Sequence, residues 1–293
     1  MPDVRVAGVI YHGLLPEADS LAATLLEQFG SGGGWWMRPL NGLDDVADML
    51  DATDLVITIG GDGTILRGVQ AAAPAGIPVL GINMGRVGFM SEIDAADAEE
   101  GLAWYLDNWD AAGSGPRIEV RAMLQAHIVD REHERFHALN DVVVGRGAAV
   151  RVIDLRTVVN GEAVITYRGD GLVVATATGS TGYALALGGP VMDPTSPAFL
   201  LKPIAAHMSL QGGMLLRPDS VVQITMESEG QATLSVDGFV DRPLSEGEAV
   251  RVETSPYSAR FLRRNPPNAF FRSLTRRLGM RQGAMPRRRR RTG

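Results

Sequence analysis

The chain contains no cysteine, which excludes disulfide bridges and thiolate metal sites. Lys202 is its single lysine, so cationic contacts to a phosphate must come mostly from arginine, whose planar guanidinium group suits phosphate. No apolar run reaches the roughly 20 residues that cross a bilayer, and Asp3 and Arg5 interrupt the apolar stretch at the N-terminus. We therefore expect a cytoplasmic protein without a membrane span or a signal peptide.

Positive charge is unevenly distributed along the chain. The formal net charge is −6, yet residues 254–293 contain many arginines and no acidic residue, and Arg287 to Arg291 are consecutive. We interpret this tail as a solvated terminus, and binding to a polyanion such as nucleic acid is the alternative. We expect neither nucleic acid nor a membrane among the partners.

The most informative segment present is a glycine-rich loop that carries one aspartate. The apolar run Leu55 to Ile59 ends at Gly60-Gly61-Asp62-Gly63-Thr64, and a stretch with helical spacing follows. Backbone N–H groups and the positive end of a helix dipole suit phosphate there. Because the loop has no lysine, it differs from a P-loop and presents a carboxylate instead. Asp62 could orient or deprotonate a substrate hydroxyl or hold Mg²⁺, and the alternative is a turn aspartate that caps the helix.

The length of 293 residues favours two domains. In residues 1–115 strands alternate with helices, which predicts an α/β domain with a Rossmann-like parallel sheet covered on both faces. A second glycine-rich segment, Asn83 to Phe89, follows the apolar strand Pro78 to Ile82. Ligands bind beyond the carboxyl ends of such strands, where both glycine-rich segments would lie.

Beyond a Gly- and Ala-rich linker at 111–116, strands follow one another with few helical patterns. Residues 116–265 are expected to form a mainly antiparallel β domain that binds a dinucleotide. One of its strands is predicted over Ala138 to Val144, and Asn160-Gly161 predicts a hairpin. Residues 266–293 would form a return helix, Phe270 to Leu278, and the basic tail.

Several further segments carry polar groups that suit ribose and phosphate. They are Arg168-Gly169-Asp170-Gly171, the hydroxyl-rich turn Thr176 to Tyr183, and Asn140-Asp141. Arg67, about one turn into the helix after Asp62, could reach a phosphate. For each of these the alternative is an ordinary turn or surface residue. The histidines show no zinc-ligand spacing, so no protein metal site is predicted.

Taken together, these segments resemble the NAD kinase (ATP-NAD kinase) family over nearly the whole chain. The resemblance rests on five segments that stand in the expected order: Gly60 to Thr64, Leu80 to Phe89, Ala138-Leu139-Asn140-Asp141, Gly169 to Pro190, and Leu262 to Leu278. The sequence departs from the family's pattern at Ala177, Gly182, Ala206 and Phe239.

The resemblance implies transfer of the terminal phosphoryl group of ATP to the 2′-hydroxyl of the adenosine ribose of NAD. It implies Asp62 as the catalytic residue, Gly60, Gly61 and Thr64 as the phosphate loop, Mg²⁺ as the metal, and a homodimer or homotetramer. The residues that it implies for NAD binding are Gly63, Arg67, Asn140, Asp141, Arg151, Arg168, Asp170, Thr178, Thr181, Gly182, Tyr183, Ala184, Leu185, Ala186 and Ala205.

The residues alone leave two other hypotheses about the function open. A lipid kinase of the diacylglycerol or sphingosine type shares the glycine-aspartate loop. A non-catalytic NAD(H)-binding sensor would use the same pocket without turnover.

Overall fold

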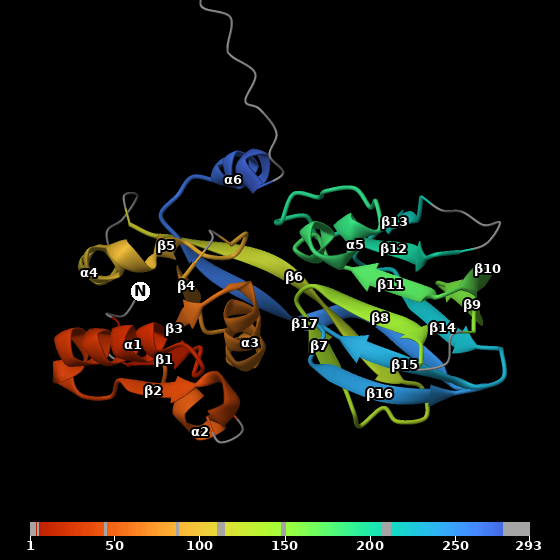
Figure 1. The fold of residues 1–293 in the computed structure, drawn as a ribbon, viewed down its shortest axis with the longest axis horizontal. Helices are drawn as coiled ribbons and strands as arrows, with labels where there is room; N and C mark the ends of the chain where they lie inside the picture. The colour runs from red at the N-terminus through yellow and green to blue at the C-terminus, as the bar shows by residue number, and fades with distance from the viewer. Residues whose placement is uncertain are drawn as a thin grey trace, which may run out of the picture.

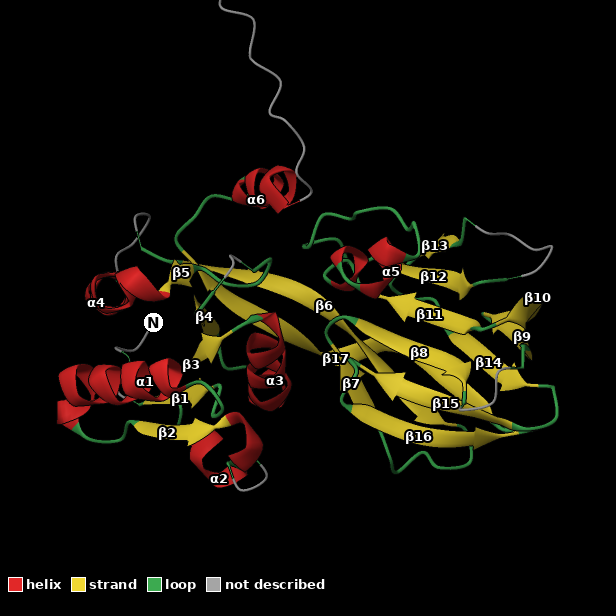
Figure 2. Ribbon diagram, viewed as in Figure 1, coloured by secondary structure: helices red, strands yellow, loops and turns green. Residues whose placement is uncertain are grey.

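Two sheets organise the chain, and the larger one contains a pair of long strands that runs through both halves of the molecule (Figure 1). The computed structural model describes residues 4, 6–43, 46–85, 88–109, 115–147, 151–206 and 212–277. The arginine tail and the middle of the expected linker lie outside these residues. Figure 2 shows helices gathered around the N-terminal strands and strands dominating the other half. No helix among the described residues is long and apolar enough to cross a membrane.

The N-terminal half is a parallel sheet covered by helices on both faces, as the alternating pattern predicts. Its strands pair in the order β2-β1-β3-β4, and β5 pairs with β4. Helices α1 and α4 share one buried cluster with this sheet, and α2 and α3 share another on the opposite face. The elements are β1 (Ala7–Tyr11), α1 (Pro16–Phe29), β2 (Trp36–Pro39), α2 (Ala47–Leu50), β3 (Leu55–Gly60), α3 (Asp62–Ala72), β4 (Val79–Asn83), β5 (Ile93–Asp94) and α4 (Ala98–Asp107).

The C-terminal half packs a smaller antiparallel sheet against the continuation of the larger one. The smaller sheet has the order β13-β12-β11-β8-β15-β16, and a core of mostly aliphatic side chains separates it from β6, β9, β14 and β17. The elements are β6 (Arg117–Ile128), β7 (Phe136–Ala138), β8 (Asp141–Arg146), β9 (Ile153–Val159), β10 (Glu162–Gly169), β11 (Gly171–Ala175), α5 (Tyr183–Ala186), β12 (Phe199–Ile204), β13 (Met214–Leu216), β14 (Val222–Met226), β15 (Gln231–Val236), β16 (Val240–Ser245), β17 (Ala249–Arg263) and α6 (Ala269–Arg277). Short 3₁₀ helices occupy Gly30–Gly32, Leu40–Gly42, Ala73–Ala75, Ala95–Asp97 and Gly179–Thr181.

The long antiparallel pair β6 and β17 connects the two halves (Figure 1). At its end β17 also pairs in parallel with β4, through Phe261 and Val79. The parallel sheet of the N-terminal half therefore continues into strands from the C-terminal half. The domain boundaries after residues 115 and 265 stay a prediction, and residues 110–114, just before the first of them, lie outside the described part.

Two local expectations were wrong in their boundaries. The strand predicted over residues 138–144 is divided into β7 and β8, because a turn at Leu139 and Asn140 directs its backbone amides to the carboxylate of Asp237. The helix after the glycine loop begins at Asp62, earlier than its apolar spacing indicated, with Gly61 as the extended residue before it. The hairpin predicted at Asn160-Gly161 is confirmed between β9 and β10.

Candidate active site

Asp62 is the first residue of α3, and Gly61 alone separates it from the end of β3. Its half-buried carboxylate accepts hydrogen bonds from the backbone N–H groups of Phe89 (3.2 Å) and Met90 (3.4 Å). The backbone approaches so closely that a Cβ atom on Gly88 would lie 1.9 Å from Asp62 Oδ1. The fold thus brings the two glycine-rich segments together at this carboxylate. Residues 86 and 87 of the second segment lie outside the described residues.

A cavity of about 500 Å³ lies at the carboxyl ends of the parallel strands. His12 follows β1, Gly61 and Thr64 follow β3, and Asn83 ends β4, so the rule for ligand position in such sheets is satisfied. Thr64 Oγ1 and His12 Nδ1 are buried there without a hydrogen-bond partner in the described part of the chain. With backbone amides at the N-terminus of α3, this cavity suits the phosphates of a nucleotide.

The turn Leu139-Asn140-Asp141 is held by Asp237, which follows β15, the strand paired with β8 in the same sheet. Asp237 accepts hydrogen bonds from the backbone N–H groups of all three turn residues, at 2.8, 2.8 and 3.0 Å. It also accepts one from Gln70 Nε2 of α3, at 3.0 Å. Gln70 lies on α3, the helix that begins with Asp62. The carboxylate of Asp237 therefore connects the predicted ribose-binding turn to the helix that carries the predicted base.

Asp141 and Asp237 form a buried pair of carboxyl groups beside that turn. Burial and, second, the negative charge of Asp237 raise the pKa of Asp141 from 3.8 to about 7. Burial also raises the pKa of Asp237, although hydrogen bonds from the turn amides and Gln70 oppose the rise. A protonated Asp141 can donate a hydrogen bond, which widens the range of ligand groups that it can recognise.

The hydroxyl-rich segment packs against the same turn. Thr176 donates its backbone N–H to Asn140 O (2.9 Å) and its hydroxyl to Leu139 O. A Cβ atom on Gly179 would lie 2.1 Å from Asn140 O, so only glycine allows this approach. Thr178 Oγ1 is buried without a partner among the described residues. The 3₁₀ turn Gly179–Thr181, Gly182 and α5 follow, and they contain the remaining predicted residues Thr181, Gly182, Tyr183, Ala184, Leu185 and Ala186.

A second group of the residues predicted to bind NAD lies away from the turn at Asn140. Asp170 precedes β11 and pairs with Arg146 at 2.8 Å, whereas the turn at Asn140 lies beside the opposite end of that strand. The length of β11 places the two ends on the order of 20 Å apart. Two further predicted residues lie on the Asp170 side: Arg168 on β10 and Ala205 after β12. Exposed Arg151 lies in the loop before β9. The structure therefore does not bring all predicted dinucleotide residues to one place.

Arg67 of α3 points toward the C-terminal half. Its guanidinium carbon lies 5.1 Å from the centroid of the Phe239 ring. Phe239 also lines the cavity at the strand ends, together with Gly63. An arginine stacked in this way remains near the phosphate side of the site.

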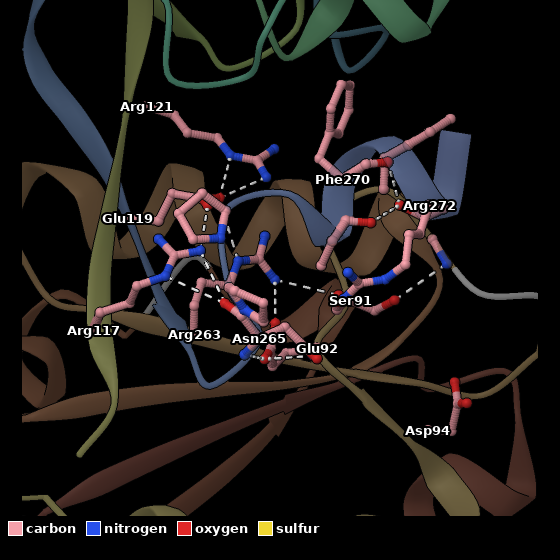
Figure 3. A pocket seen from close by; sticks show the side chains of 16 residues that line it. Ser91, Glu92, Asp94, Arg117, Glu119, Arg121, Arg263, Asn265, Phe270 and Arg272 are labelled. Atoms are coloured by element: carbon pink, nitrogen blue, oxygen red, sulfur yellow. Dashed lines mark hydrogen bonds and ion pairs between the residues drawn. The ribbon is translucent and has the colours of Figure 1, made fainter. Parts of the chain in front are cut away.

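The sequence interpretation missed an ionic cluster beside Asp62. Figure 3 shows Arg117, Arg121 and Arg263 converging on Glu119 at the wall of a cavity of about 620 Å³. Burial alone would raise the pKa of Glu119, but the charges of Arg121 and Arg263 outweigh it and lower the pKa to about 2. Charged residues at 117, 119 and 121 alternate along one strand, and this spacing was the available signal.

Arg263 connects this cluster to the segment that holds Asp62. Its Nη1 donates hydrogen bonds to Met90 O (2.8 Å), Ser91 O (3.2 Å) and Glu92 Oε2 (3.2 Å). Since the backbone N–H of Met90 binds the Asp62 carboxylate, the cluster stabilises the segment that holds Asp62.

Comparisons with known proteins agree with this arrangement. The family model of the ATP-NAD kinase N-terminal domain matches residues 38–108, and that of the ATP-NAD kinase C-terminal domain matches residues 139–264. The NAD kinase of Dehalococcoides mccartyi strain CBDB1 is 38% identical over 273 residues, which cover 91% of this chain and 93% of that protein. The NAD kinase of Symbiobacterium thermophilum is 41% identical over 213 residues, 72% of this chain and 73% of that protein.

Solved structures show the same fold. An NAD kinase from Archaeoglobus fulgidus in complex with ATP superposes with a TM-score of 0.72 at 26% identity, covering 94% of this chain and 99% of that one. Yeast NADH kinase complexed with NADH gives a TM-score of 0.79 at 23% identity, covering 97% and 90%. Both domain models match in order and the relatives align over most of their length; the chain belongs to the NAD kinase family.

Proposed function

We propose that this chain is an NAD kinase, which transfers the terminal phosphoryl group of ATP to the 2′-hydroxyl of the adenosine ribose of NAD. The observation that carries the proposal is the placement of Asp62. This carboxylate lies at the N-terminus of α3, and the glycines on either side of it line the cavity that suits phosphate. The family model of the ATP-NAD kinase N-terminal domain covers this segment.

Asp62 acts as the general base or orienting group for the acceptor hydroxyl. Two backbone N–H groups bind its carboxylate from one side. Carboxylate oxygens accept hydrogen bonds, and Asp62 would accept the one that the ribose hydroxyl donates. The fixed orientation supplies the positioning on which phosphoryl transfer mainly depends.

The phosphate donor ATP binds at the carboxyl ends of β1, β3 and β4. The support for this assignment is the cavity there and the glycine-rich backbone at the start of α3. The related NAD kinase from Archaeoglobus fulgidus was solved with ATP bound.

A magnesium ion fits this site as a companion of the nucleotide. Among the described residues no cluster of three or more His, Asp or Glu side chains could hold a metal ion alone. Mg²⁺ commonly takes one or two protein oxygens and several phosphate oxygens, and the half-buried carboxylate of Asp62 would supply a protein oxygen. When bound, the ion would neutralise charge on the transferred group.

The dinucleotide lies between Asp62 and the turn Asn140-Asp141. Leu139 packs in the same buried cluster as Leu66 and Val69 of α3, which keeps the two sides in a fixed relation. Asn140, Asp141 and the segment 178–186 would bind ribose and base groups. A homodimer or homotetramer would let the distant group around Asp170 reach a ligand bound to a neighbouring subunit, and light scattering measures this state.

The decisive experiment incubates the purified protein with ATP, Mg²⁺ and NAD and measures NADP with an NADP-specific dehydrogenase. We expect NADP to form, and we expect Asp62→Asn to lower turnover by at least about a hundredfold, because a carboxamide cannot accept the hydroxyl proton. Asp219→Asn, on an exposed surface, is the matched control. Calorimetry should show that Asp62→Asn still binds NAD.

Near-normal turnover in Asp62→Asn would refute the assignment of the base. If the wild type phosphorylates diacylglycerol or sphingosine and not NAD, the hypothesis of a lipid kinase replaces the proposal. NAD binding without any turnover would instead indicate a sensor.

A further inference from the structure

Arg121 lies in the interior of the molecule and lines the larger cavity, close to the segment that holds Asp62. The cavity of about 620 Å³ is bordered by Gly88 and Phe89 as well as by Arg121. Phe89 donates its backbone N–H to the Asp62 carboxylate, and Gly88 contacts that carboxylate. The larger cavity therefore borders the backbone that binds the Asp62 carboxylate, and Gly61 and Gly63, the neighbours of Asp62 in the chain, line the smaller cavity.

The Arg121 side chain is only 3% exposed and is held rigidly. Its Nε and Nη2 donate to Glu119 Oε1 at 3.0 and 2.8 Å, and its guanidinium carbon lies 4.7 Å from the centroid of the Phe261 ring. Nη1 makes no hydrogen bond to the described residues. It is also absent from the fully buried side-chain atoms that lack a partner, so it has some exposed surface. Because the side chain lines the cavity, the N–H groups of Nη1 are available to a ligand there.

Arg121 carries its positive charge at neutral pH. Burial and the charge of Arg263 lower its pKa to about 10, while Glu119 and the negative charge of Asp62 act in the opposite direction. The glycine loop itself contributes no cation, because it has no lysine. Phosphoryl transfer develops charge on the oxygens of the transferred group, and an arginine commonly neutralises that charge.

We propose that Arg121 is a catalytic residue that binds the phosphoryl group in transit through Nη1. This inference rests on the proposed NAD kinase function. The ribose O–H gives its proton to Asp62 as the oxygen forms a bond to the γ-phosphorus. The bond from that phosphorus to the β,γ-bridging oxygen breaks, and its electron pair leaves with ADP. Arg121 forms no covalent bond and offsets the charge on the peripheral oxygens.

Glu119 is the positioning residue for this arginine. It binds two donors of Arg121 and so turns the third nitrogen toward the cavity. Glu119 also accepts hydrogen bonds from Arg117 Nη2 (3.1 Å) and Arg263 Nε (3.3 Å). Loss of the Arg121 guanidinium group therefore leaves the buried carboxylate paired, and the fold should tolerate the substitution.

The test compares Arg121→Ala and Arg121→Lys with the control Arg251→Ala in the NAD kinase assay. Arg251 has the same geometry in an ion pair far from the site: its Nε and Nη2 bind Glu253 Oε2 at 3.2 and 3.0 Å, two residues along β17. We expect Arg121→Ala to lower kcat by at least about a hundredfold with a small change in the KM for NAD. Added guanidinium ion, at concentrations far below those that unfold proteins, should restore part of the activity of this variant alone.

Arg121→Lys should fold, since it keeps the charge, but a single ammonium group cannot bind Glu119 and the ligand in the same way, so kcat should still fall. Normal turnover in either variant would overturn the inference. It would also be overturned by an equal loss in Arg251→Ala, or by a loss in Arg121→Ala that appears entirely in KM and does not respond to guanidinium. Wild-type turnover is measured in parallel, so a failure of the proposed function is recognised separately.

Discussion

Replacing Asp141 by asparagine should make the stability of the protein less dependent on pH. In the folded protein, burial and the charge of Asp237 raise the pKa of Asp141 from 3.8 to about 7. The folded form therefore holds this proton more tightly than the unfolded chain does. Its contribution to stability is fully present below about pH 4 and is lost as pH rises through about 7.

The size of the effect follows from the shift. A rise from 3.8 to about 7 corresponds to about 4 kcal/mol of differential proton affinity. Asparagine has the shape of the protonated acid and does not ionise. The free energy of unfolding of Asp141→Asn should therefore exceed that of the wild type by little near about pH 4 and by up to about 4 kcal/mol near about pH 8.

Urea unfolding of both proteins across this pH range measures the difference. Asp241→Asn, at an exposed position on β16, is the control for loss of one negative charge and should change stability by less than about 0.5 kcal/mol. A difference between wild type and Asp141→Asn that is the same at low and high pH would refute the reasoning, because it would show that Asp141 is not a buried titrating group.

Two further substitutions test how the site is held together. Gln70→Ala removes the hydrogen bond from α3 to Asp237, so it should lower the free energy of unfolding by about 1.5–3 kcal/mol and raise the KM for NAD. Gln125→Ala removes a similar bond to the carboxylate of Glu253 and should leave the KM for NAD unchanged. Phe261→Ala empties a fully buried position between two guanidinium groups and should cost about 3–5 kcal/mol by urea unfolding, whereas Phe271→Ala, 52% exposed, should cost little. Equal effects within either pair would contradict the structural account.

The local elements were accessible from the sequence because short-range rules govern them. The helix expected from Pro16 to Phe29 is α1, and Pro16 stands in its first turn, where its missing N–H costs nothing. The β-branched run before Gly60 forms β3, which is buried along its whole length. The hairpin at Asn160 follows from turn chemistry alone.

The functional network was less accessible because its partners are far apart in the chain. Glu119 pairs with Arg263 on another strand, and Asp237 binds the turn at Asn140 from nearly a hundred residues away. Period-two patterns predict which residues share a face of a strand, but they do not predict which strand lies opposite. Gln70 carried no signal, since its surroundings on α3 read as an ordinary helix.

The sequence by itself determined the glycine loop with its aspartate, the alternation that makes a parallel sheet, and the segments that place the chain in its family. These are properties of neighbouring residues, and local sterics and hydrophobic spacing express them directly. Only the tertiary structure decided that Arg121 lines a cavity with Phe89, whose backbone binds Asp62, that Asp141 is buried next to Asp237, and that the residues around Asp170 lie at the far end of β11. The physical reason is that burial, charge pairing and pKa depend on segments that meet only when the sheets assemble.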